Sequence, residues 1–276
     1  MGGRPIVTIV TDSSAALDAA TAAAHGVVVV PGRITIGDEV YRDGELPLEE
    51  VIARYGEGVT TAGPGPGDFL RALGETPGEV LMLSLTHHLS SAIDSARVAA
   101  ADAGPRVRLV DTGTAAGGLA LVVLYAAAKA RAGGTMDEVE QAARRAMAGV
   151  RLVVQVGTLD YLIAGGRLPA SVGRVGTRLG LRPMVEVDQS GLHTLRPAFS
   201  KRAADDRMMK IWRGTRREGA RLHVAVMHVL AEGEGRKLLA RVKAEVQPAT
   251  ELVTNFGAIM VVHTGPVLTG LSWWWE

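Results

Sequence analysis

The amino-acid sequence predicts an α/β protein with two domains: an N-terminal parallel sheet flanked by helices, and a C-terminal α/β domain with a mixed or antiparallel sheet. The length of 276 residues favours about two domains. The first half alternates short β-branched runs with alanine-rich helical runs, whereas the second half contains a hairpin pattern. We therefore place the boundary near residue 150, between domains 1–150 and 151–276.

The first half has a regular order of strands and helices. Thr135 and Glu138 have the spacing of a capping box, so a helix should begin there and end at about residue 149. The other expected strands are Ile6–Thr11, Val27–Pro31, Val80–Leu85 and Val107–Asp111, and the other expected helices are Ala15–Ala24, Leu48–Tyr55, Ser90–Ala101 and Ala115–Ala130.

The pattern changes after residue 150. The turn DQSG, in which Gly191 can take a positive φ, joins two expected strands and is followed by a basic helix. The expected elements of this half are strands at Met184–Val187, Leu192–Phe199, Leu222–Met227 and around Ala258–Val262, and a helix at Glu232–Val246.

Composition excludes several classes of function. The chain has no cysteine, which rules out disulfides, thiolate nucleophiles and cysteine-ligated zinc. The N-terminal apolar run is too short for a signal peptide, and Ala115–Ala128 is shorter than the roughly 20 residues that span a bilayer, so we expect a cytoplasmic protein. A formal net charge of +1 gives no electrostatic reason to bind nucleic acid.

The C-terminal stretch SWWWE places Trp273, Trp274 and Trp275 in a row. We expect this tail to pack back on its domain. Contact with a membrane interface or with the mouth of a pocket is the alternative, because tryptophan favours such positions.

Three candidate site residues lie where an expected strand or loop meets a helix. Asp12 ends the first strand, Thr61 lies in the loop TTAGPGPGDF, and Ser90 begins a helix at or near its N-cap. This edge of an open α/β sheet is where ligands usually bind, and helix N-termini favour anions. The alternative is that these side chains only cap helices or turn the chain.

Two further candidates carry charge or titrate. Arg167 follows two glycines in LDYLIAGGRLP, and His263 ends an expected strand in IMVVHTGP. An interdomain salt bridge is the alternative role for Arg167, and a structural role is the alternative for His263. The adjacent residues His87 and His88 do not predict a metal site, and no Walker loop, dinucleotide fingerprint or H-E-x-x-H motif occurs.

Eight of these stretches, in this order, resemble the DegV family of fatty-acid-binding proteins, whose members serve bacterial fatty acid kinase. The similarity covers almost the whole chain. The matching segments are IVTDSSAAL, VVVVPGRITIGDEVYRDG, TTAGPGPGDF, LSSAIDSA, VRLVDTG, LDYLIAGGR, LGLRPMVEVDQSG and VVHTGP.

The resemblance implies a non-catalytic protein that buries one long-chain fatty acid, uses no cofactor, and presents the carboxylate to a fatty acid kinase for acyl phosphate formation. By the family motifs, Thr61 and Ser90 hold the carboxylate. Arg167 and His263 lie near it and support phosphoryl transfer. The sequence departs from the family motifs T-S-x-P-S and L-S-G-T at Ala62, Gly65, Ser91 and Ala92.

Two other functions stay open at this point. A hydrolase or phosphatase would use Ser90 or Asp12 with His263, but the G-x-S-x-G elbow of many serine hydrolases is missing. A regulatory module that senses a lipid is the other alternative.

Overall fold

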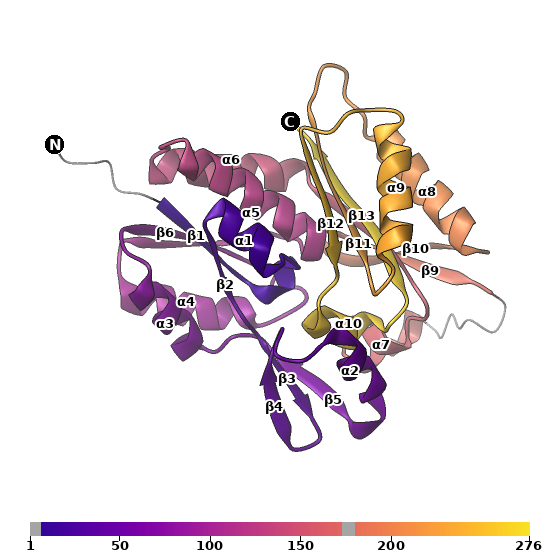
Figure 1. Cartoon of the computed structure of the whole chain (residues 1–276), viewed down its shortest axis with the longest axis horizontal. Coiled ribbons are helices and arrows are strands. Elements are labelled where there is room, and N and C mark those ends of the chain that lie inside the picture. The colour runs from indigo at the N-terminus through magenta and orange to yellow at the C-terminus, as the bar shows by residue number, and fades with distance from the viewer. Residues whose placement is uncertain (1–6, 173–179) are drawn as a thin grey trace.

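The computed structural model describes residues 7–172 and 180–276, and it contains two large sheets and one small sheet (Figure 1). The first large sheet is fully parallel, as predicted, with the strand order β2-β1-β6-β7. Its strands are β1 (Val7–Asp12), β2 (Val27–Val30), β6 (Glu79–Ser84) and β7 (Val107–Asp111).

Helices cover both faces of the parallel sheet. Alternate residues of β1 point to opposite faces, so Ile9 packs toward α5 and α6, whereas Val10 packs toward α3 and α4. The capping box predicted at Thr135 and Glu138 is present, and the helix that it begins ends at Gly149. The helices are α1 (Ala19–His25), α3 (Pro66–Glu75), α4 (Ala92–Ala103), α5 (Ala116–Arg131) and α6 (Met136–Gly149).

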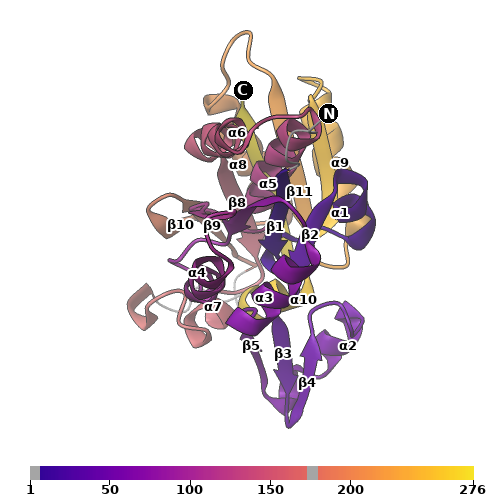
Figure 2. The same ribbon diagram turned by 90° about the vertical axis from the view of Figure 1, so that its left-hand side faces the viewer.

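The second large sheet is mixed, with the strand order β10-β9-β8-β13-β11-β12 and β11–β12 as its parallel pair. Helices α8 and α9 cover its outer face, and α5 lies between its inner face and the parallel sheet (Figures 1 and 2). The elements are β8 (Arg151–Val156), β9 (Arg182–Asp188), β10 (Gly191–Ala198), β11 (Leu222–His228), β12 (Thr250–Asn255), β13 (Leu268–Trp275), α8 (Lys201–Gly214) and α9 (Glu232–Lys243).

Helix α5 explains the longest apolar run of the sequence. It contacts β1 on one side and β11 and β13 on the other, and it is apolar around its whole circumference because sheets lie on both sides. The strands of the parallel sheet all precede residue 150 and those of the mixed sheet all follow it. Since α5 packs on both sheets, the division into domains 1–150 and 151–276 stays a prediction.

A small antiparallel sheet of order β4-β3-β5 projects from the parallel sheet with α2 beside it (Figure 1). The sequence analysis above does not predict this sheet. Its strand β5 carries Thr61. The remaining elements are β3 (Arg33–Ile36), β4 (Glu39–Arg42), β5 (Val59–Ala62), α2 (Leu48–Ala53), α7 (Asp160–Ala164), α10 (Ala258–Thr264), and the 3-10 turns Ser13–Ala15, Tyr55–Glu57 and Ala170–Val172.

The C-terminal tryptophans pack on their own domain, as predicted, and they do so as part of a central strand. β13 lies between β8 and β11, and Trp273 and Trp274 are at most 1% exposed. Trp273 and Trp275 face α8, whereas Trp274 faces the core around α5. A strand covered on both faces can hold three consecutive aromatic residues. These side chains are therefore not available for contact with a membrane.

The strand predicted around Ala258–Val262 is wrong: the segment is helix α10. A short continuous apolar run fits a buried strand and a buried helix equally well. Here Gly257 (φ 80°) and Gly265 (φ 79°) bound the helix in conformations that glycine adopts readily.

The first predicted helix was also misplaced. It begins at Ala19 rather than Ala15, because Ser13–Ala15 form a 3-10 turn that ends at Ala16 with a φ of 51°. Ile6 of the first predicted strand and Leu179 of the motif LGLRPMVEVDQSG lie outside the described residues.

Candidate ligand-binding site

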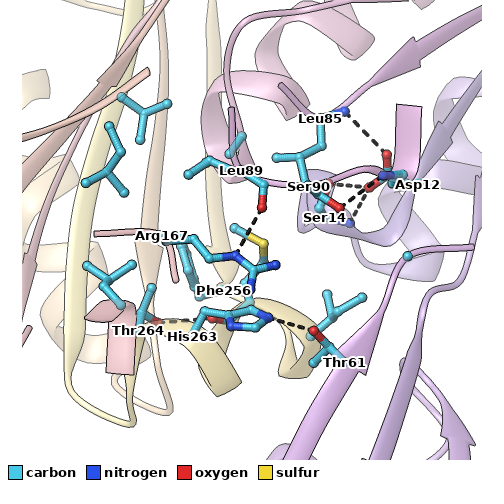
Figure 3. Close-up of a pocket in the computed structure, with 18 of the residues that line it drawn as sticks. Asp12, Ser14, Thr61, Leu85, Leu89, Ser90, Arg167, Phe256, His263 and Thr264 are labelled. Atoms are coloured by element: carbon cyan, nitrogen blue, oxygen red, sulfur yellow. Dashed lines mark hydrogen bonds between the residues drawn. The ribbon is translucent and has the colours of Figure 1, made fainter. Parts of the chain in front are cut away.

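A cavity of about 390 Å³ lies between the two large sheets, where the carboxyl ends of β1 and β6 meet the inner face of β8 and β9 (Figure 3). This volume is within the usual range for small-molecule pockets, roughly 300 to 1,000 Å³. The structure brings together all four predicted site residues here: Thr61, Ser90, Arg167 and His263 line the cavity, and Asp12 does so too.

Thr61 and His263 form a hydrogen-bonded pair in the wall of the cavity. Thr61 is in β5, and His263 lies in the last turn of α10, which packs against β5. Thr61 Oγ1 lies 2.6 Å from His263 Nε2, and a dashed line marks this hydrogen bond in Figure 3. This hydrogen bond joins residues 202 positions apart in the chain.

Arg167 enters the cavity because α7 ends in two glycines. Gly166 takes a φ of 73°, and the backbone N–H of Arg167 then donates to Leu162 O at 2.8 Å. The guanidinium donates from Nε to Leu89 O at 3.0 Å and from Nη1 to Gly165 O at 2.6 Å. Among residues 7–172 and 180–276 it has no ion pair with a carboxylate, so the salt bridge considered as its alternative role is wrong.

Burial controls the charge of His263. It lowers the pKa of the imidazole, and the nearby positive charge of Arg167 lowers it further, to about 4. The ring is therefore neutral at pH 7. Burial also lowers the pKa of Arg167, but a guanidinium stays protonated in proteins. Among the described residues, the cavity thus holds one fixed positive charge beside a neutral imidazole.

Ser90 is one residue before the N-cap of α4. The N-cap is Ser91, whose side chain makes no capping hydrogen bond. Ser90 Oγ instead accepts a hydrogen bond of 3.1 Å from the backbone N–H of Ala92. A Cβ on Gly63 would lie only 2.6 Å from Ala92 Cβ, so the missing side chain at position 63 lets α4 approach the loop after β5. This contact brings Ser90 and Thr61 to the same cavity.

Asp12 is a buried carboxylate at the end of β1. It accepts hydrogen bonds from the backbone N–H of Ser14 at 2.9 Å, from the Ser14 hydroxyl, and from Leu85 N and Ser84 Oγ at 3.4 Å. Burial raises its pKa. In the described part of the chain, neither Asp12 nor Ser90 hydrogen-bonds to His263.

The other side of the cavity is apolar, and the sequence analysis above does not predict it. Leu152 and Val154 of β8 pair with Val187 and Val185 of β9, and these four side chains share one face of the sheet. The sequence signal that could have found this wall is an apolar residue at every second position, at 152 and 154 in β8 and at 185 and 187 in β9. The further apolar lining includes Ala62, Leu85, Leu89, Ala92, Ala115, Leu162, Leu192, Phe256, Ile259 and Met260.

The two large sheets enclose a cavity that is polar at one end and apolar at the other. This arrangement is typical of the class of α/β proteins that bind amphipathic small molecules. Sequence comparison gives the family. Residues 6–276 match the family described as uncharacterised proteins of the DegV family, and the chain belongs to this family.

Relatives cover nearly the whole chain. A DegV domain-containing protein of Streptomyces coelicolor is 34% identical over 273 residues, covering 96% of this chain and 97% of the relative. A fatty acid-binding protein of Thermotoga maritima is 25% identical and covers 96% of both. The solved structure of a DegV family protein from Thermus thermophilus, described by its fatty acid binding, matches with a TM-score of 0.88 and 28% identity, over 98% of this chain and 99% of that one. The predicted family and fold class are confirmed.

Among residues 7–172 and 180–276, no helix is both long enough and apolar enough to cross a membrane. No group of three or more histidine and acidic side chains there is arranged to hold a metal ion.

Proposed function

We propose that this chain binds one long-chain fatty acid, with the acyl tail on the apolar side of the cavity and the carboxylate near Thr61 and Ser90. The observation that carries the proposal is the division of one cavity into an apolar wall and a polar end, where hydroxyl groups lie near a guanidinium that has no ion pair within the described residues. The names of the Thermotoga and Thermus relatives support the same ligand class.

The acyl tail supplies most of the binding free energy. Burying roughly fourteen CH₂ and CH₃ groups at ~0.8 kcal/mol each gives ~11 kcal/mol before the costs of ordering the ligand. The wall formed by Leu152, Val154, Val185 and Val187 offers such a surface.

The polar end fixes the position of the carboxylate. A carboxylate that leaves water needs hydrogen-bond donors, and the hydroxyls of Thr61 and Ser90 can donate to it. Ser90 also lies just before α4, whose N-terminal dipole favours an anion. Arg167 adds a positive charge that no carboxylate of the described chain neutralises.

The finer part of the proposal is presentation to a fatty acid kinase in the cytoplasm. The protein would hold the carboxylate, and the kinase would supply ATP, metal and the phosphoryl-transfer machinery. Arg167 suits this step, because a planar guanidinium binds carboxylate and phosphate oxygens alike. His263 would order the same end of the cavity through Thr61. In this proposal the chain itself is not an enzyme.

A hydrolase is less consistent with the site. A general base works best when its pKa is near the pH of the reaction. His263, with a pKa of about 4, would be a weak base for Thr61, and it has no hydrogen bond to Ser90 or Asp12 within the described residues.

Mass spectrometry of the purified protein tests the proposal. Under native conditions the protein should carry one extra mass, which denaturation releases as a long-chain fatty acid in equimolar amount. Val187→Trp, which fills the cavity wall, should carry little lipid, whereas Val153→Ile, on the opposite face of β8, should load normally. An empty wild-type protein that also hydrolyses esters would refute the carrier role.

A further inference from the structure

Helix α10 begins without a capping side chain of its own. The backbone N–H groups in the first turn of a helix have no partner within the helix, and the side chain of the N-cap residue usually accepts from one of them. The N-cap of α10 is Gly257, and glycine has no side chain that could accept a hydrogen bond. The first turn of α10 therefore depends on acceptors from outside its own segment.

Asp43 supplies such an acceptor from the small sheet. It directly follows β4, and its Oδ1 accepts a hydrogen bond of 3.3 Å from the backbone N–H of Ile259, 216 positions away in the chain. The backbone N–H of Ala258 also hydrogen-bonds to this carboxyl group. Ala258 and Ile259 are the first two residues of α10, so Asp43 takes the place of the missing cap.

Asp43 is itself held in place by hydrogen bonds. Its backbone N–H donates to Gly32 O at 2.9 Å, and its side chain hydrogen-bonds to Ser13. The hydroxyl of Ser13 in turn accepts from the backbone N–H of Gly32 at 3.1 Å. Burial raises the pKa of the Asp43 carboxyl group. A protonated carboxyl group keeps a carbonyl oxygen as acceptor, so the cap does not depend on the charge.

Two further contacts join α10 to the same part of the chain. The side chain of Ile259 fills the space beside Gly32, where a Cβ would lie 2.2 Å from Ile259 Cδ1. In the last turn of α10, His263 hydrogen-bonds to Thr61 of β5. Figure 1 shows α10 beside the small sheet and α2, and α10 contacts β3, β5 and α2. Both ends of α10 are therefore fixed to the small sheet and the turns next to it.

We infer that Asp43 is a positioning residue, which caps α10 from the small sheet and thereby holds His263 against Thr61 in the cavity wall. The residue that Asp43 caps, Ile259, lines the same cavity. α10 and the small sheet then form one unit of the cavity wall. The effect of Asp43 on ligand binding rests on the proposed function, whereas its effect on the position of His263 does not.

Two NMR measurements on the ligand-free protein test this role. In Asp43→Ala, the backbone N–H of Ile259 should exchange with deuterium at least about 10-fold faster relative to the N–H of Val10 in β1, which reports general stability. The pKa of His263 should rise above its value of about 4, because a displaced α10 exposes the ring to water.

Two further variants separate positioning from a general loss of structure. Asp43→Asn keeps an oxygen that can accept from Ile259, so it should restore the slow exchange of this N–H and the low pKa of His263. Asp38→Ala is the matched control, because Asp38 is exposed in the turn between β3 and β4, and it should change neither quantity. Should Asp43→Ala fail to fold, Asp43→Ser, whose shorter side chain does not reach Ile259, makes the same comparison.

Titration with palmitate tests the consequence for binding. Asp43→Ala should bind palmitate about 5-fold more weakly than the wild type, and Asp43→Asn less than about twofold more weakly. An unchanged pKa of His263 in Asp43→Ala overturns the inference, even if Ile259 exchanges faster, because α10 would then be capped without being positioned. A wild-type protein that binds no palmitate rejects the proposed function, and the two NMR measurements still decide the role of Asp43.

Discussion

Gly165 packs directly against the imidazole of His263, and a Cβ at this glycine would lie only 2.7 Å from Nδ1. The φ of Gly165 is −76°, a value that any residue can adopt, so the ring rather than the backbone requires glycine here. The second glycine, Gly166, is required by the backbone instead. A Cβ there would meet no atom within 4 Å, but its φ of 73° is a conformation that glycine adopts readily.

Gly165→Ala should therefore displace His263 and weaken its hydrogen bond to Thr61. We expect a loss of fatty acid affinity of about 5- to 10-fold, with a modest loss of stability of about 1 kcal/mol. Isothermal titration with palmitate and urea unfolding measure the two effects. Gly67→Ala, on α3 with nothing within 4 Å of the added Cβ, is the matched control: it should leave palmitate affinity unchanged and should not lower stability, because alanine favours a helix more than glycine does. An unaltered palmitate affinity in Gly165→Ala would show that the position of His263 does not matter.

Arg167→Gln should raise the pKa of His263 above its value of about 4. It should stay below the ordinary 6.5, because burial is the larger cause of the shift and remains. NMR titration of the His263 ring measures this change. A pKa that does not move would mean that Arg167 does not act on the ring.

The same variant tests the division of roles at the polar end. Palmitate binding should fall only slightly in Arg167→Gln, because the tail dominates affinity, whereas phosphorylation of bound palmitate by a fatty acid kinase should be strongly reduced. Equal losses of binding and phosphorylation would contradict separate roles for Arg167 and the hydroxyl pair.

Ser90→Ala should weaken palmitate binding about 5- to 10-fold, because it removes a donor to the carboxylate and the acceptor for Ala92 N–H. Ser91→Ala is the control: its hydroxyl makes no capping bond, and the change should alter affinity less than about twofold. Titration calorimetry on both variants makes the comparison. Similar losses in the two would remove Ser90 from the head-group site.

Asp12 should make the ligand-free protein less stable as pH rises. Its folded pKa is raised by burial, so the native state holds the proton more tightly than the unfolded chain, whose pKa is about 3.9. Stability is then lost as pH rises from about 4 through the raised folded value. Urea unfolding at pH 4.5 and pH 7 should show a larger drop for the wild type than for Asp12→Asn. Identical drops would mean that this carboxylate is not perturbed.

The sequence predicted the parallel sheet well because its strands and helices carry clear local patterns. The Thr135 capping box and the β-branched runs of β1 and β7 are examples. It failed where tertiary context decided the structure. The apolar segment Ala258–Thr264 forms a helix between two glycines, and the tryptophans of β13 form a strand because sheet neighbours cover both of their faces.

The sequence analysis named four polar residues that line the cavity, Thr61, Ser90, Arg167 and His263, but it could not predict their arrangement. The hydrogen bond between Thr61 and His263 depends on how β5 and α10 pack, and neither element was predicted in its observed form. Arg167 donates a hydrogen bond to the backbone carbonyl of Leu89. Every residue has such a carbonyl, so the sequence does not show which one Arg167 will contact. The apolar wall on β8 and β9 was missed because β8 was not predicted as a strand.

A crystal structure of the protein with palmitate tests the central claim most directly. The account predicts one palmitate in the cavity, its carboxylate within hydrogen-bond distance of Thr61 Oγ1 and Ser90 Oγ, and its tail along Leu152, Val154, Val185 and Val187. Palmitate bound elsewhere, or a carboxylate that points away from the two hydroxyls, would contradict it.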